Sequence, residues 1–313
     1  AIVIALERNY RVPRILGFRY GYAGLARSGG FEPMILNREV VDDIHQDGGT
    51  ILGSSRGPRE ASEMVDRLVE EGVDMLFTVG GDGTLRGAQT IVDEIRRRGL
   101  SIAVVGVPKT IDNDIDLISK SFGFETAVTM SRSAIVAAHT EAKGAQRGIG
   151  LVKLMGRQSG FIAAAATLAH SEVNVCLVPE VDFRIDGEGG LIEYLERRLQ
   201  NRRHAVVVVA EGAGQKYLED GSGADETDLS GNLKLKDIGM YLAGVLKNRF
   251  GSGPLTARVS YIDPSYIIRS MPATVGDSAF CLQLGHFAVH AAMAGKTGLV
   301  VGSWADHFTH VPI

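Results

Sequence analysis

Cysteine and long hydrophobic runs are scarce in this sequence, and both shortages narrow the class of protein. Only two cysteines occur in 313 residues, Cys176 and Cys281, each within an apolar stretch. We expect free, buried thiols in a reducing compartment, without a disulfide or a metal site. The longest alanine-rich apolar run, Phe161–Ala169, is too short to span a bilayer, and the amino terminus lacks the apolar segment of a signal peptide. These absences predict a cytoplasmic protein.

A strong net charge is also missing. The formal charge is -4, so no global field attracts nucleic acid or an anionic membrane surface. Forty-five per cent of the residues are hydrophobic and 22% are charged, which is typical of a folded domain rather than of a disordered chain. We therefore expect no nucleic-acid or membrane partner, and any phosphate ligand must be bound by local groups.

Glycine, in contrast, is abundant: there are 39, and many follow apolar runs. Short apolar runs alternate with segments of helical spacing, which predicts parallel strands joined by crossover helices. The expected strands are Met75–Val79, Ile102–Val107, Ile149–Leu154, Val173–Val178, Ala205–Ala210 and Gly298–Val301, and the expected helices include Pro58–Glu71, Ala88–Arg98, Glu125–Ala142 and Gly190–Gln200. The acidic, Gly- and Ser-rich stretch Tyr217–Asn232 predicts a surface excursion.

The strongest chemical signal follows the expected strand Met75–Val79, in the run Gly80-Gly81-Asp82-Gly83-Thr84. Three glycines at the carboxyl end of a strand let backbone N–H groups approach a phosphate closely. Asp82 is suited to hold Mg²⁺, and Thr84 to cap the next helix or to contact a phosphate oxygen. The alternative is a tight turn with a solvated Asp82, and several kinase groups share the pentapeptide.

A second signal follows the next strand, in the run Pro108-Lys109-Thr110-Ile111-Asp112-Asn113-Asp114. Proline ends the strand, and acids two residues apart alternate in direction in an extended loop. One carboxylate can then face a sugar hydroxyl while the other reaches a metal or a second donor. A hydroxyl nucleophile needs such an acceptor, and a transferring phosphoryl group needs cations and N–H donors. A turn whose side chains only satisfy their own backbone is the alternative, but two such loops on successive strands favour phosphoryl transfer.

These two motifs occur in the same order as three further ones: Met155-Gly156-Arg157, Ala210-Glu211-Gly212 and Tyr261–Arg269. Together they resemble the 6-phosphofructokinase family, from about Gly17 to the end of the chain. Within the family, they are similar to a branch that contains both ATP-dependent and pyrophosphate-dependent enzymes. The resemblance implies an α/β fold of two Rossmann-like domains with mainly parallel sheets and an active site in the cleft between them. It also implies an allosteric homodimer or homotetramer.

The resemblance assigns residues 1–145 to a domain that binds ATP and Mg²⁺, and residues 146–313 to a domain that binds fructose 6-phosphate. A second series of strands starting near Gly144–Gly148 agrees with that boundary, although the chain can cross back near its carboxyl terminus. Family members have an earlier strand that ends in a Gly-Gly loop. Because no such loop precedes Ala1, we expect the first domain to lack its first strand.

The resemblance also implies roles for the motif residues. Asp112 would accept the proton of the fructose 1-hydroxyl, Thr110 and Asp114 would shape its loop, and the charge of the transferred group would be stabilised by Lys109. Donor binding would involve Arg56, Gly57, Gly81, Asp82, Gly83 and Thr84, with Asp82 as the ligand of Mg²⁺. Substrate binding would involve Thr110, Ile111, Asp112, Met155, Gly156, Arg157, Glu211, Tyr266, Ile267, Ile268 and Arg269.

Several of these residues also have ordinary structural readings. Arg157 precedes an expected helix, where a cation is electrostatically unfavourable, and this favours a phosphate partner. Glu211 ends a strongly apolar strand, where a charge without a function would be costly. Tyr266 and Arg269 lie three apart and could simply be neighbours on a helix surface. We expect His286 and His290, four apart on an apolar stretch, to pack in a core rather than bind a metal.

Two residues bear on the identity of the phosphoryl donor, and they favour different donors. Gly83 leaves room for the rest of a nucleotide, whereas pyrophosphate users commonly carry an acid there, which would also repel the α-phosphate. Lys109 occurs in pyrophosphate users but also in ATP users of this branch. We therefore predict a glycolytic kinase that transfers the γ-phosphoryl group of ATP to the 1-hydroxyl of D-fructose 6-phosphate. A pyrophosphate-dependent enzyme and a non-catalytic regulatory subunit remain alternatives, while a dehydrogenase lacks its Gly-x-Gly-x-x-Gly motif.

Overall fold

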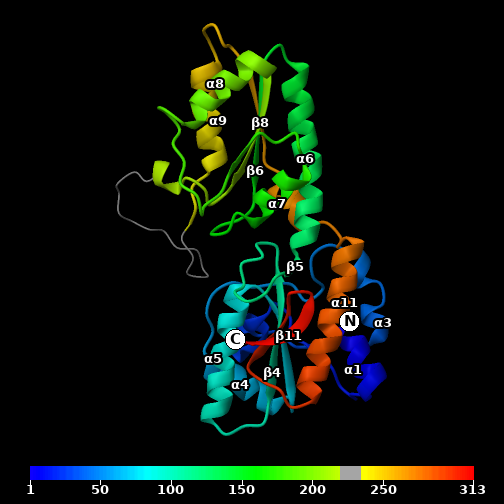
Figure 1. Cartoon of the computed structure of the whole chain (residues 1–313). Helices are drawn as coiled ribbons and strands as arrows, with labels where there is room; N and C mark the ends of the chain where they lie inside the picture. Colours follow the sequence, from blue (N-terminus) through cyan, green and yellow to red (C-terminus); the bar gives the residue numbers. More distant parts are fainter. Residues whose placement is uncertain (219–233) are drawn as a thin grey trace. The chain divides into compact units, whose positions relative to one another are not determined.

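A computed structural model describes residues 1–218 and 234–313. They form two compact units, each built around its own β-sheet (Figure 1). The first unit contains Ala1–Glu125 and Met271–Ile313, and the second contains residues 126–218 and 234–270. The predicted α/β fold with mainly parallel sheets is confirmed. The surface excursion expected at Tyr217–Asn232 lies, beyond its first two residues, outside the described part of the chain.

The main sheet of the first unit has the strand order β11-β10-β4-β3, with the short β5 paired to the end of β4. All pairs are parallel except β10 with β11. The strands are β3 (Met75–Gly80), β4 (Ala103–Thr110), β5 (Phe122–Gly123), β10 (Leu299–Trp304) and β11 (His307–Pro312). A separate antiparallel pair joins β1 (Leu16–Gly17) to β2 (Met34–Ile35).

Helices cover both faces of this sheet. Successive side chains of a strand point to opposite faces, and because apolar side chains lie on both faces, each face packs against helices. Val104 belongs to a core with α4 and α5, and its neighbour Val105 belongs to a core with α11. The long helices are α1 (Ile2–Tyr10), α4 (Ala61–Glu70), α5 (Asp82–Arg97) and α11 (Val275–Met293), and the short ones are α2 (Tyr22–Leu25), η1 (Arg27–Gly29), α3 (Arg38–Val41) and η2 (Ile44–Gln46).

The second unit has a four-stranded, fully parallel sheet in the order β7-β8-β6-β9. Its strands are β6 (Gly148–Leu154), β7 (Val175–Leu177), β8 (His204–Ala210) and β9 (Arg258–Ile262). Its helical segments are α6 (Phe124–Gly144), α7 (Phe161–Ala169), α8 (Leu191–Arg202), η3 (Gln215–Tyr217), α9 (Ile238–Phe250) and α10 (Ser265–Arg269).

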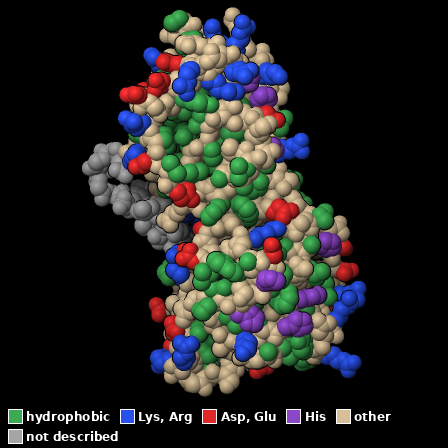
Figure 2. Space-filling model, viewed as in Figure 1, with side chains coloured by type: hydrophobic (Ala, Val, Ile, Leu, Met, Phe, Trp, Pro, Cys, Tyr) green, Lys and Arg blue, Asp and Glu red, His purple; other side chains and the backbone are tan. Residues whose placement is uncertain are grey.

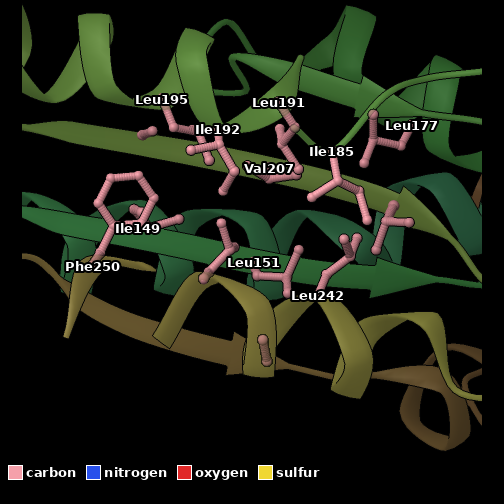
Figure 3. Close-up of a cluster of buried hydrophobic side chains, with 14 of the residues drawn as sticks. Ile149, Leu151, Leu177, Ile185, Leu191, Ile192, Leu195, Val207, Leu242 and Phe250 are labelled. Atoms are coloured by element: carbon pink, nitrogen blue, oxygen red, sulfur yellow. The ribbon is translucent and has the colours of Figure 1, made fainter. Parts of the chain in front are cut away.

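One face of the second sheet is covered by α8 and α9. Figure 3 shows Leu195 of α8 and Leu242 of α9 among the side chains that gather over Leu151 and Val207 of the central strands. These four side chains are fully buried. Such a continuous core makes the sheet a firm support for the loops that leave its edge.

The two units differ from the domain ranges predicted from the sequence. The boundary lies after Glu125 rather than near residue 145, and Met271–Ile313 belongs to the first unit, a return that the sequence had left open. The reason is that β10 pairs with β4, with Val300 opposite Gly106, while α11 packs on the same sheet. A local apolar pattern cannot show which of two sheets a strand will join.

Three other expectations concern single residues and membrane spans. Cys176 and Cys281 are free, as predicted, and only partly buried; this burial raises the pKa of both thiols. The core position predicted for His290 is wrong, because its ring is exposed and its Nδ1 lies 2.7 Å from the hydroxyl of Tyr10.

Among the described residues, no helix is both long and apolar enough to cross a membrane. On the face shown in Figure 2, acidic and basic side chains are spread over each unit.

Candidate active site

The two glycine- and acid-rich motifs meet at the carboxyl edge of the first sheet. Gly80, the last residue of β3, pairs with Pro108 of the adjacent parallel strand β4, so both following loops leave the same edge. A Cβ atom placed on Gly81 would lie 3.2 Å from the Cβ of Thr110. The loops are therefore in contact, as their positions after successive strands predict.

The first motif forms the turn between β3 and α5. Helix α5 begins at Asp82, and Gly81 occupies its N-cap position without a side-chain cap. Thr84 therefore does not cap the helix; its side chain packs against Gly80. The first N–H groups of a helix lack intrahelical partners and carry partial positive charge. A strand-to-helix turn of this kind can receive a phosphate group.

Gly83 faces open space in the turn. Apart from its chain neighbours and the backbone of its own helix, no heavy atom lies within 4 Å of a Cβ placed there, and the residue is exposed. The adjacent Asp82 carboxylate pairs with the guanidinium of Arg86 at 2.6 Å, one helical turn along α5. Arg86 was not among the predicted site residues, although its i,i+4 spacing from Asp82 is a recognisable signal.

Tyr22 supports the same turn from beneath. Its hydroxyl donates a hydrogen bond to the carbonyl oxygen of Thr84 at 2.5 Å, and burial raises the pKa of this phenol. Its ring lies so close to Gly87 that a larger side chain would displace it. Tyr22 could not be predicted from the sequence, because nothing local links it to a helix that begins sixty residues later.

The second motif forms a loop that is closed by its own side chains. The amide of Asp112 donates to Thr110 Oγ1 at 3.1 Å. Asn113, with φ of 55°, accepts a hydrogen bond from the amide of Ser121 at 2.7 Å and donates through Nδ2 to the carbonyl of Ser119 at 3.3 Å. The hydroxyl of Ser121 also donates to the carbonyl of Thr110 at 2.7 Å. The loop that carries half-buried Asp112 is thus held in one shape.

The pKa of the Asp114 carboxylate indicates that the two motifs lie close together. Its pKa is raised, first by burial and further by the negative charge of Asp82 on the neighbouring turn. Lys109 is exposed at the same edge and provides a cation there. The described residues contain no group of three or more His, Cys, Asp or Glu side chains that could hold a metal ion by themselves. A metal at Asp82 would thus need further oxygen ligands, such as those of a phosphate.

Arg56 and Gly57, the other predicted donor residues, lie in the irregular segment that precedes α4. Gly57 has φ of 96°, a conformation that favours glycine. Their predicted contact with the donor remains a prediction.

The predicted acceptor residues follow the strands of the second sheet. Leu154 of β6 pairs with Ala210 of β8, and the amide of Glu211 donates to the carbonyl of Leu154 at 2.9 Å. The amide of Gly212 similarly donates to the carbonyl of Gly156 at 3.0 Å. The structure thus brings the Met155–Arg157 motif beside Glu211.

Glycine is required at two points where these loops cross. Gly156 has φ of 130°, and a side chain there would strike the carbonyl of Ser159. Gly212 lies so close to the carbonyl of Arg157 that no Cβ atom fits. Both glycines therefore permit the close approach of the two loops.

The remaining predicted acceptor residues lie on α10, which follows β9 at the same edge of the second sheet. The guanidinium of Arg269 lies over the ring of Tyr266, 5.0 Å from its centroid. Tyr266 is 81% exposed, and Ile267 is also exposed. Ile268, in contrast, is buried, so its side chain anchors the helix and is not available to a ligand.

Comparison with known proteins identifies the family of the chain. A family model described as phosphofructokinase matches residues 1–292. The chain belongs to the phosphofructokinase family. It is 49% identical, over its full length, to the ATP-dependent 6-phosphofructokinase of Borreliella burgdorferi. It is 50% identical over 99% of its length to the enzyme of the same name in Amycolatopsis methanolica, and 48% identical over 99% to ATP-dependent 6-phosphofructokinase 7 of Arabidopsis thaliana.

The phosphofructokinase chain spans about two thirds of the length of these relatives: 71%, 68% and 64%, respectively. Its fold is similar to that of solved phosphofructokinases. The Pichia pastoris enzyme matches 99% of this chain and 32% of its own, with a TM-score of 0.79 and 21% identity. A pyrophosphate-dependent enzyme from Marinobacter aquaeolei matches 99% of this chain and 76% of its own, with a TM-score of 0.76 and 22% identity. At such low identity these likenesses describe the fold alone.

The hydrogen bonds of Asn113 lead to a prediction for this phosphofructokinase. Asn113→Gly keeps the left-handed backbone but removes the bonds to Ser121 and Ser119, each worth about 1 kcal/mol. We expect roughly a tenfold loss of kcat, because the loop no longer holds Asp112 in one place. Asn113→Asp keeps the acceptor and should lose less. Steady-state kinetics of the two variants test this, and full turnover by Asn113→Gly would contradict it.

Proposed function

We propose that this chain transfers the γ-phosphoryl group of ATP to the 1-hydroxyl of D-fructose 6-phosphate, yielding fructose 1,6-bisphosphate and ADP, as a 6-phosphofructokinase of glycolysis. The observation that carries the proposal is the contact between the Gly81–Thr84 turn and the loop of Asp112. It is supported by relatives of about half-identical sequence that are named ATP-dependent 6-phosphofructokinases.

In this reaction, Asp112 accepts the proton of the 1-hydroxyl as its oxygen forms a bond to the γ-phosphorus. The bond between that phosphorus and the bridging oxygen of ADP breaks, and ADP leaves with the electron pair. Charge on the transferring group is met by Lys109 and by the N-terminus of α5. The hydrogen bonds of Thr110 and Asn113 keep the base in place before substrate arrives.

The donor set suits Mg²⁺ carried by a nucleotide. Asp82 offers a single exposed carboxylate at the turn, and Mg²⁺ commonly combines one or two carboxylates with phosphate oxygens and water. Bound there, the ion would neutralise charge on the β- and γ-phosphates. Before it binds, Arg86 shields the charge of Asp82.

Residues of the second unit would bind the sugar phosphate. Arg157 and Arg269 provide cations for its 6-phosphate, Tyr266 adds a hydroxyl donor, and Glu211 accepts hydrogen bonds from the sugar hydroxyls. These side chains follow neighbouring strands of one sheet edge. We propose further that the protein works as a cytoplasmic homodimer or homotetramer, which sedimentation equilibrium would measure.

ATP is favoured over pyrophosphate by the open space at Gly83, which leaves room for the α-phosphate and nucleoside. The deciding experiment measures turnover of fructose 6-phosphate with Mg²⁺ and either ATP or pyrophosphate. We expect turnover with ATP. Turnover with pyrophosphate alone would overturn the choice of donor, and turnover with neither would favour a regulatory subunit.

A further inference from the structure

A charged lysine lies inside the core of the second unit, next to the acceptor loops. Lys153 is the sixth residue of β6, whose residues are all buried, and it precedes the Met155–Arg157 motif by two positions. Its side chain is only 11% exposed. Burying a charge is costly unless the charge is paired, so the partners of this lysine indicate what role it has in the unit.

Lys153 bridges two carboxylates that come from different elements. Its Nζ lies 2.9 Å from Oδ2 of Asp263, just after β9, and 3.0 Å from Oδ2 of Asp237, the N-cap of α9. Burial by itself would lower the pKa of this lysine, but its hydrogen bonds to Asp263 and Asp237 outweigh burial and raise it. Lys153 is thus a permanent cation that joins three segments.

The two carboxylates do different work. Asp237 accepts a hydrogen bond from the amide of Met240 at 3.0 Å and so caps α9. Asp263 accepts one from the amide of Ser265 at 3.1 Å and another from its hydroxyl. Ser265 is the first residue of α10, so the contact of Lys153 with Asp263 reaches the helix that carries Tyr266 and Arg269.

Helix α10 needs such an anchor. It has only five residues, too few to be stable alone. Three of them, Tyr266, Ile267 and Arg269, are exposed, and only Ile268 is buried. A mobile α10 would have to be ordered each time a ligand bound, and the cost of ordering would weaken binding.

We propose that Lys153 is a positioning residue for the sugar phosphate: through Asp263 it holds α10 in the conformation in which Tyr266 and Arg269 bind the phosphate of fructose 6-phosphate. The inference rests on the proposed function, because it assigns these two residues to that ligand. The contact of Lys153 with Asp237 belongs to the frame of the unit and does not serve the ligand.

The chain offers a matched pair of variants, Asp263→Asn and Asp237→Asn. Each removes one negative charge from the same lysine, and each asparagine can still accept the backbone hydrogen bond made by the aspartate. We expect Asp263→Asn to raise KM for fructose 6-phosphate roughly tenfold, with kcat and KM for ATP changed by less than about twofold. We expect Asp237→Asn to leave all three within about twofold.

Calorimetric titration of fructose 6-phosphate and hydrogen exchange of the α10 amides complete the test. The Asp263→Asn variant should bind more weakly and exchange faster in α10, and Asp237→Asn should do neither. If both variants lose affinity equally, or neither does, the inference is wrong. If the wild type binds no fructose 6-phosphate, the proposed function fails first, and the inference fails with it.

Direct replacement of the lysine gives a second test. Lys153→Met leaves two carboxylates facing each other and should raise KM for fructose 6-phosphate by more than Asp263→Asn does. Lys153→Arg keeps the charge and should restore most of the affinity. Thermal melting shows whether each variant is folded; a folded Lys153→Met with wild-type affinity would overturn the proposal.

Discussion

Replacing Asp112 by serine is expected to lower kcat by roughly 10²–10⁴-fold, with a modest change in KM. The loss has this size because the variant removes the proposed general base while leaving the proposed binding groups in place. Serine keeps the backbone amide that donates to Thr110 Oγ1, so the shape of the loop should survive. Steady-state kinetics with fructose 6-phosphate and MgATP measure both constants.

Asp116 provides the matched control. It is an exposed acid four residues further along the same segment and has no assigned role. Asp116→Ser should change kcat by less than about threefold, because it removes equal charge without removing the base. An unchanged kcat in Asp112→Ser would eliminate the role assigned to Asp112. Equal losses in both variants would show that the charge of the loop, not the base, matters.

Replacing Gly83 by aspartate is expected to abolish the use of ATP. The fold should accept the change, since a Cβ at Gly83 meets no neighbouring atom and an acid is favourable in the first turn of α5. The new carboxylate would instead occupy the space proposed for the donor and repel its phosphates. Two like charges 4 Å apart near a protein surface repel by about 4 kcal/mol, which corresponds to roughly a 10³-fold loss in kcat/KM for ATP.

The variant Gly83→Ala separates the effect of the added negative charge in Gly83→Asp from the effect of the added side-chain volume. It adds only the Cβ atom, for which the turn has room, and should retain much more ATP turnover than the aspartate variant. Titration with fructose 6-phosphate should give the wild-type affinity for both variants, which would show that the residues proposed to bind the acceptor are intact. Retained ATP turnover in Gly83→Asp would show that the donor does not lie beside this residue.

The local elements of the site could be predicted from the sequence. The apolar run that ends at Gly80 forms β3, and the glycines after it form the turn into α5. The prediction that Pro108 ends the strand is wrong, because β4 runs through it to Thr110, but the acids that follow do lie in a loop. Because adjacent parallel strands end at one edge, the meeting of the two motifs follows from their order in the chain.

The supporting contacts could not be predicted in the same way. Tyr22 reaches the carbonyl of Thr84, and Lys153 joins Asp237 to Asp263, across long stretches of chain. No periodicity or motif links such residues, because they come into contact only after the strands of each sheet have paired.

The sequence by itself determined the α/β class and most of the strands and predicted a chemistry for the two motifs, because strand, turn and helix patterns are local. Only the tertiary structure decided that the returning segment is Met271–Ile313, with β10 beside β4, and that Asp263 ties α10 to a buried lysine. Strand pairing and charge burial depend on which distant segments become neighbours. The packing of the whole unit determines these neighbours, so a local pattern cannot predict them.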